Sequence, residues 1–68
     1  MENLYPSAIR RLRAKLNISQ TELAALMGVS FTSVNRWESG KYKPTTKTKR
    51  KLAPLFEKYN IEVGDENE

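Results

Sequence analysis

The sequence contains no cysteine and no histidine among its 68 residues. Without cysteine there is no disulfide bond and no thiolate metal ligand. Without histidine there is no imidazole to act as a general base or to bind a metal ion. We therefore expect a protein that holds neither a metal ion nor another cofactor.

Acidic side chains are scarce outside the last eight residues. Residues 1–60 contain only four, which are Glu2, Glu22, Glu38 and Glu57. Two-metal hydrolytic sites need clustered carboxylates, and these four are spread along the chain. A chain this short buries about 60% of its unfolded surface, which leaves little room for a catalytic cleft beside a core. The sequence thus argues against an enzyme.

Long apolar runs are also missing, since no stretch approaches the roughly 18 residues of a membrane-spanning helix. The first five residues lack the basic stretch and apolar run of a signal peptide. We therefore expect a cytoplasmic protein that makes no contact with a membrane.

Positive charge is what the chain does have. The net charge is +4, but residues 61–68 hold four acids and no base, so residues 1–60 carry 12 − 4 = +8. A basic body is typical of a protein that binds a polyanion, although a solvated basic surface is the simpler alternative. We expect one nucleic-acid-binding domain over residues 1–60 and an acidic, disordered tail over residues 61–68.

The first predicted helix begins near Pro6, because proline suits the first turn of a helix. Ile9, Leu12 and Leu16 recur at helical spacing and form one apolar stripe. Asn17 is a suitable end, since asparagine tolerates the left-handed conformation found there.

The second helix is predicted over residues 20–27. Ser19 and Glu22 have the spacing of a capping box at its start, and Gly28 suits its end because glycine adopts positive φ without steric cost. Its inward residues should be Leu23, Ala24 and Met27.

Ser30 is the expected cap of a third helix, over about residues 31–38, which Ser39-Gly40 ends. The turn over residues 28–30 is too short for the two helices to run parallel, so they should cross steeply with Val34 and Trp37 between them. This arrangement is a helix-turn-helix. The fold class predicted is all-α, a compact bundle of four to five short helices.

The last helical region has an apolar stripe that Pro54 interrupts; its members are Leu52, Leu55, Phe56 and Tyr59. Proline removes an amide donor and crowds the preceding turn, so a kink or a break is expected. We favour a break, with helices at about residues 46–53 and 54–59.

The outward face of the third helix carries the chemistry expected for reading bases. Asn35 and Arg36 can form paired hydrogen bonds with adenine and guanine, and Thr32 and Phe31 can contact the thymine methyl group. A merely solvated face would favour Glu and Lys instead. The alternative for Phe31 is that it folds back onto Leu23 or Leu26 as part of the core.

Phosphate contacts are expected around that helix. The free amides at Gln20 and Thr21 suit an anion, Ser33 lies at the flank of the helix, and Lys41, Lys43 and Lys47 lie where the chain returns toward the DNA. Such contacts supply affinity and salt dependence rather than sequence preference. Arg50 and Lys51, at the start of the last helical region, could also reach phosphate. For these two residues, a place on a solvated surface without a DNA contact is at least as good an explanation.

Arg13 borders the apolar stripe of the first helix and therefore needs a partner. Glu38, beside Trp37 at the end of the third helix, is the best candidate. We predict a partly buried Arg13–Glu38 pair that holds the first helix against the third.

The segments 19–24, 27–30 and 34–41, followed by Pro44, resemble the Cro/C1-type (XRE-like) helix-turn-helix family, which includes the lambdoid phage repressors. The resemblance covers about residues 8 to 58 and implies five helices, with the third in the major groove of DNA. By position it implies that Gln20 touches phosphate and braces the third helix, that Phe31, Thr32 and Arg36 read bases, and that Arg13 pairs with Glu38.

The function expected is sequence-specific binding of double-stranded DNA by a repressor-like transcriptional regulator. Such domains usually bind two-fold sites as dimers, and we expect a homodimer that is weak or forms on DNA. The alternative is an antitoxin, or the DNA-targeting module of a restriction or mobile-element system, which would add a protein partner. A protein-interaction module that shares the fold fits the basic body less well.

Overall fold

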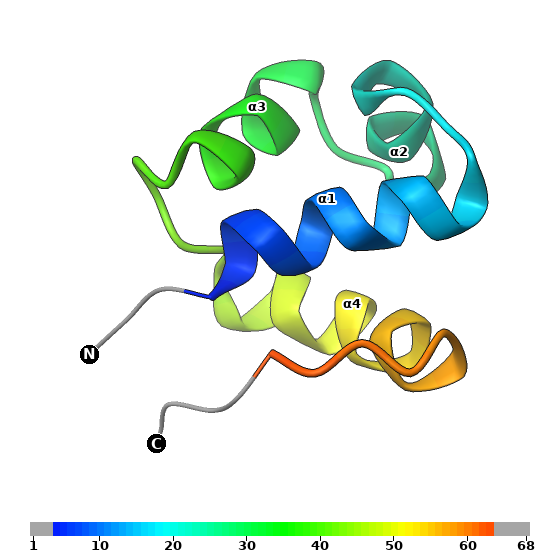
Figure 1. Ribbon diagram of the computed structural model, residues 1–68. Coiled ribbons are helices and arrows are strands. Elements are labelled where there is room, and N and C mark those ends of the chain that lie inside the picture. Colours follow the sequence, from blue (N-terminus) through cyan, green and yellow to red (C-terminus); the bar gives the residue numbers. More distant parts are fainter. Residues whose placement is uncertain (1–3, 64–68) are drawn as a thin grey trace.

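The computed structural model describes residues 4–63, which form four α-helices. They are α1 (Tyr5–Leu16), α2 (Gln20–Met27), α3 (Phe31–Ser39) and α4 (Thr46–Lys58). In Figure 1, α1 crosses the middle of the molecule, with α2 and α3 on one side and α4 on the other. The all-α class is confirmed. The structure has four helices over the described residues, rather than the five that the family resemblance implies.

The helix ends follow the local signals in the sequence. Asn17 ends α1 with φ 58°, and Gly28 ends α2 with φ 71°. The capping box at the start of α2 is complete: the Glu22 amide donates to Ser19 Oγ at 3.0 Å, and the Ser19 amide donates to Glu22 Oε1 at 2.8 Å. Ser30 caps α3 by accepting from the Ser33 amide at 3.1 Å. Each cap satisfies backbone groups that the helix itself leaves unpaired.

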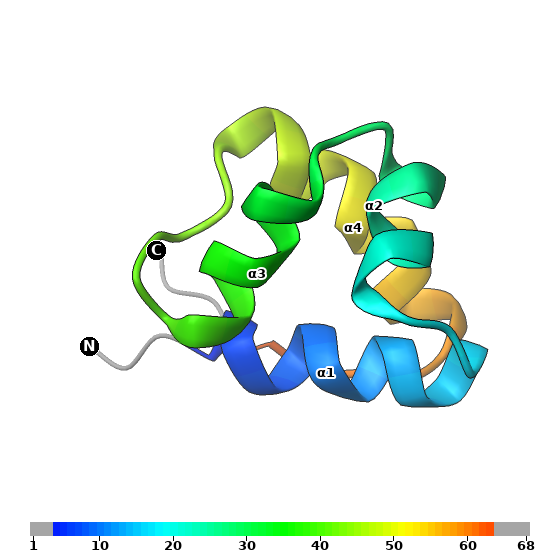
Figure 2. The ribbon, with the colours of Figure 1, turned by 90° about the horizontal axis from the view of Figure 1, so that it is seen from above.

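The core lies where the four helices converge. Its buried apolar residues come from every helix and from the segment after α4: Ala8, Ile9, Leu12, Leu23, Ala24, Met27, Val34, Trp37, Leu52, Phe56 and Ile61. Leu16 packs against this core but is only partly buried. The small side chain of Ala24 and the sharp turn at Gly28 allow α2 and α3 to cross closely, which Figure 2 shows from above. The central helix-turn-helix is thus present as predicted.

The predicted break at Pro54 is wrong, because α4 is one continuous helix with Pro54 inside it. Leu52 and Phe56, on either side of the proline, are both buried. Their burial holds the two halves in line, while Pro54 itself and Arg50, whose carbonyl loses its amide partner, are exposed. Water can therefore satisfy that carbonyl, and the cost of the missing hydrogen bond is tolerated.

The packed region continues past residue 60, where the acidic tail was expected to begin. Asn60 has φ 58°, and the Ile61 amide donates to the Phe56 carbonyl at 2.8 Å. This is the hydrogen-bond pattern of a Schellman motif, which turns the chain back at a helix end. The turn places Ile61 in the core. The acids Asp65, Glu66 and Glu68 of the predicted tail lie outside the described residues.

Ile61→Val should lower the free energy of unfolding by about 1 kcal/mol, the usual cost of removing one buried methyl group. Chemical denaturation followed by circular dichroism measures this change. Glu62→Gln, at the exposed neighbouring position, is the control and should leave stability unchanged within about 0.5 kcal/mol. Equal stability of Ile61→Val and the wild type would show that the segment after α4 does not contribute to the core.

No helix within residues 4–63 is both long enough and apolar enough to cross a membrane.

Candidate nucleic-acid interface

The outer face of α3 is open to solvent. Val34 and Trp37 point into the core, while Phe31, Thr32, Asn35 and Arg36 are exposed. Phe31 is 47% exposed, so it does not fold back into the core. Four side chains that can contact base edges therefore project from one side of a short helix.

Arg36 keeps its hydrogen-bonding groups free. Among residues 4–63 the only ion pair is Arg13–Glu38, and the side chain of Arg36 has one specific contact, with the ring of Tyr42. The guanidinium carbon lies 4.9 Å from the centre of that ring. A ring contact of this kind leaves the five N–H donors of the guanidinium available to a ligand.

Behind the exposed face, a pair of charges joins α1 to α3. Arg13 Nε donates to Glu38 Oε2 at 2.6 Å, and Arg13 Nη2 donates to Glu38 Oε1 at 3.0 Å. Arg13 Nη1 also donates to the Ile18 carbonyl at 3.2 Å, and Arg10 Nη1 donates to the Glu38 carbonyl at 2.7 Å. The Arg13–Glu38 pair expected from the sequence is therefore present as a bidentate ion pair, and the hydrogen bonds to the two neighbouring carbonyl groups support it.

The same carboxylate is connected to the exposed face of α3 through Gln20. Gln20 Nε2 donates to Glu38 Oε1 at 3.0 Å, and Asn35 Nδ2 donates to Gln20 Oε1 at 3.3 Å. A side-chain amide has two N–H donors, so Asn35 retains one donor and its carbonyl oxygen. Those are the two groups needed for paired hydrogen bonds with adenine. The Gln20 contact therefore orients Asn35 and leaves both of these groups without a partner within residues 4–63.

The ionisation of Glu38 follows from these contacts. Burial raises the pKa of Glu38, but the hydrogen bonds from Arg13 and Gln20 and the charges of Arg13 and Arg10 lower it more, so its pKa lies below the ordinary value of 4.5. In turn, the hydrogen bond to Glu38 raises the pKa of Arg13. Both groups are therefore charged at neutral pH.

The lowered pKa of Glu38 predicts a loss of stability in acid. Because the folded-state pKa lies below the unfolded one, the carboxylate contributes its full stabilisation above about pH 4.5, and this contribution is lost as the pH falls through the folded-state pKa. Glu38→Gln lacks this group, so its free energy of unfolding should change less steeply below pH 4.5 than that of the wild type. Parallel slopes for the two proteins in denaturation at several pH values would contradict the assignment.

Comparison with known proteins identifies the architecture. The family model described as "Helix-turn-helix" matches residues 9–58, which includes all of α2, α3 and α4 and most of α1. The chain belongs to this helix-turn-helix family. It is also 39% identical over 57 residues to an "Uncharacterized HTH-type transcriptional regulator" of Archaeoglobus fulgidus, a match that covers 84% of this chain and 76% of that protein. No solved structure matches the present chain significantly.

Several residues expected to contact phosphate lie at the edges of this helix-turn-helix. Thr21, Lys41, Lys43 and Lys47 are exposed. Gln20 is half-buried, and its amide already bonds to Glu38 and Asn35, which leaves one side-chain N–H. The hydroxyl of Ser33 is 3.1 Å from that of Ser30, so it is partly engaged within the cap of α3.

The start of α4 carries basic residues at positions 47, 49, 50 and 51, and two of them contact other parts of the domain. Lys49 Nζ lies 5.5 Å from the centre of the Tyr5 ring. Lys51 Nζ donates to the Met27 carbonyl at 3.3 Å, which satisfies a group at the end of α2. Arg50 is exposed. The density of charge in the sequence therefore overstates how many of these cations are free for a ligand.

Sequence reasoning missed two contacts around the site, those of Arg10 and Tyr42. Arg10 bonds to the Glu38 carbonyl, and its spacing of three residues from Arg13 on one helix was the available signal. Tyr42 was the only aromatic residue in the basic loop between α3 and α4, and an exposed aromatic beside cations is a recurring form of cation–π contact.

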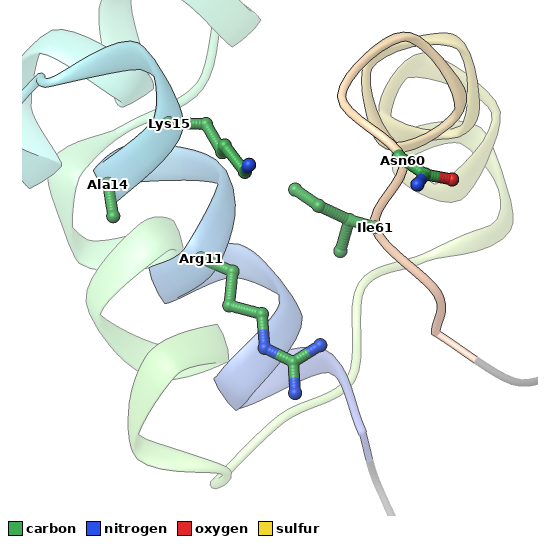
Figure 3. Close-up of a pocket in the computed structure, with 5 residues that line it drawn as sticks. All are labelled: Arg11, Ala14, Lys15, Asn60 and Ile61. Atoms are coloured by element: carbon green, nitrogen blue, oxygen red, sulfur yellow. The ribbon is translucent and has the colours of Figure 1, made fainter.

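A second group of cations lies on the side of α1 away from α3. Figure 3 shows Lys15 and Ile61 extending toward each other across a shallow pocket, which is lined by Arg11, Ala14, Lys15, Asn60 and Ile61. The pocket lies between α1 and the segment after α4, whereas α3 is on the opposite side of α1 (Figure 1). Variants at this pocket can therefore serve as controls for variants on the α3 face.

Residues 4–63 contain no cluster of acids that could hold a metal ion.

Proposed function

We propose that this protein binds double-stranded DNA sequence-specifically and regulates transcription, with α3 reading the major groove. The observation that supports this most strongly is the outer face of α3, where Phe31, Thr32, Asn35 and Arg36 are exposed together. Helix-turn-helix proteins use this helix in the major groove, and Asn35 and Arg36 have the donors and acceptors needed to distinguish base pairs.

The charge of the protein supports the same function. Residues 1–60 carry +8, and Lys41 and Lys43 follow α3 directly in an exposed loop. Lysines around a reading helix attract the phosphate backbone and fix the orientation of the helix. The Archaeoglobus relative, whose name describes a transcriptional regulator, agrees with this role. We expect the protein to act in the cytoplasm, as a homodimer that is weak or forms on DNA.

Selection from randomised duplex DNA tests the proposal. Bound DNA would be recovered and sequenced over several rounds at two salt concentrations. Enrichment of a short motif at both concentrations is expected, and a palindromic motif would indicate that two copies bind together. Binding that disappears at higher salt without enrichment of any motif would overturn sequence-specific recognition.

Lys43→Ala should weaken binding to all duplexes nearly equally and reduce the slope of log affinity against log salt by about one unit. The reason is that a phosphate contact releases about one counterion without reading sequence. Titrations at four or more salt concentrations measure the slope. Lys15→Ala is the matched control, because it removes the same charge from the side of α1 that faces away from α3. Equal slopes for the two variants would place the DNA elsewhere.

A further inference from the structure

We propose that Tyr42 is a positioning residue for Arg36, whose ring holds the guanidinium in the orientation that reads DNA. Tyr42 would contact no base itself. It would influence specificity at the base pair that Arg36 contacts, through its effect on the orientation of Arg36. The inference rests on the proposed function and adds to it a residue outside the recognition helix.

The contact between the two side chains is well formed. The Arg36 guanidinium carbon lies 4.9 Å from the centre of the Tyr42 ring, within the roughly 6 Å range of a cation–π interaction. Tyr42 is 55% exposed, so its ring is not a core residue that touches Arg36 incidentally. Within residues 4–63 this is the one specific contact of the Arg36 side chain, so Tyr42 has no competitor there in setting its orientation.

The backbone after α3 directs Tyr42 back toward Arg36. Gly40 adopts φ 82°, and its amide donates to the Trp37 carbonyl at 3.3 Å. Ser39 Oγ donates to the Arg36 carbonyl at 3.0 Å and accepts from the Lys41 amide at 3.4 Å. The hydroxyl thereby ties the start of the loop to the residue that Tyr42 contacts.

The far end of the same loop is also fixed. Pro44 is buried, although its neighbours on both sides are exposed. Proline has a restricted backbone, and its burial anchors the loop to the domain. Tyr42 therefore lies between two anchored points, so its ring is presented to Arg36 by a defined loop.

The geometry of the guanidinium allows it to contact Tyr42 and DNA together. The Arg36 guanidinium contacts the π face of the Tyr42 ring, while its five N–H donors, which lie at the edge of the planar group, have no hydrogen-bond partner within residues 4–63. Guanine accepts a pair of hydrogen bonds at O6 and N7 from that planar edge. The contact with Tyr42 thus restricts the rotamers of Arg36 before DNA arrives and leaves its reading edge free. Lower entropy loss on binding is the expected consequence.

The test compares Tyr42→Leu with Tyr42→Phe on the DNA motif selected by the wild type. Tyr42→Leu should reduce discrimination at the Arg36 base pair by about two- to fivefold, the strength of an exposed cation–π contact, with other positions unchanged. Tyr42→Phe retains the ring and should keep wild-type discrimination. The melting temperatures of both variants should match that of the wild type, which separates positioning from stability.

Arg36→Ala, measured beside them, separates failure of this inference from failure of the proposed function. If the wild type selects no motif, or Arg36→Ala leaves its motif unchanged, reading by Arg36 is wrong and the role of Tyr42 fails with it. If Arg36→Ala relaxes one position but Tyr42→Leu discriminates as well as the wild type there, the inference about Tyr42 alone is overturned. Sharper discrimination in Tyr42→Leu would also overturn it, because the ring would then be withholding Arg36 from DNA.

Discussion

Arg13→Ala is expected to lower the free energy of unfolding by about 3 kcal/mol. This value is the lower end of the range found when a buried ion pair loses one partner. The Glu38 side chain is 6% exposed, whereas that of Arg13 is 25% exposed. Without Arg13, the carboxylate would remain buried with Gln20 as its remaining side-chain donor. In a domain this small, such a loss is a large part of the total stability.

The two partners should not be equivalent. Glu38→Ala leaves behind the more exposed Arg13, which water can hydrate, so its cost should be smaller, about 1–2 kcal/mol. Denaturant titrations give both values. Arg11→Ala removes the same type of side chain from an exposed position of α1 and should change stability by no more than about 0.5 kcal/mol. Wild-type stability in Arg13→Ala would show that the pair does not hold α1 against α3.

Arg36→Ala is expected to weaken binding to the selected DNA motif by about 1–3 kcal/mol and to relax the preference at one base position. The loss is specific because Arg36 lies on the outer face of α3 and is free of ion pairs with the described residues. The free energy of unfolding of Arg36→Ala should equal that of the wild type, since the Arg36 side chain is exposed. Binding titrations on the motif and its single-base variants measure both effects.

The control for this experiment is again Arg11→Ala, which removes an equal charge from the pocket side of α1. It should weaken binding slightly at low salt, through the general field, and leave the motif unchanged. If Arg36→Ala and Arg11→Ala weakened binding equally and neither altered the motif, α3 would not be the reading helix.

The parts of the fold that could be predicted were those governed by short-range chemistry. The Ser19–Glu22 capping box and the turn at Gly28 depend on a few neighbouring residues, so the sequence alone specified where α2 begins and ends. The partnership of Arg13 and Glu38 also followed from simple reasoning, because a charge at the edge of an apolar stripe needs a partner across the helix interface.

The errors came where tertiary packing outweighed a local preference. Pro54 disfavours a continuous helix locally, but the burial of Leu52 and Phe56 keeps α4 intact. Ile61 stands beside acidic residues in the sequence, yet the turn at Asn60 brings it into the core. The contact of Tyr42 with Arg36 depends on the path of a loop, which residue types alone do not specify.

The most direct test of DNA reading by α3 is an NMR titration of the labelled protein with a duplex carrying the selected motif. If α3 reads the DNA, the largest shifts should occur at the amides and side chains of Phe31, Thr32, Asn35 and Arg36, with weaker changes in the loop at Lys41 and Lys43. Ala14 and Asn60, in the pocket on the other side of α1, should be nearly unchanged. Changes concentrated around that pocket, with the α3 face undisturbed, would contradict the claim that α3 reads the DNA.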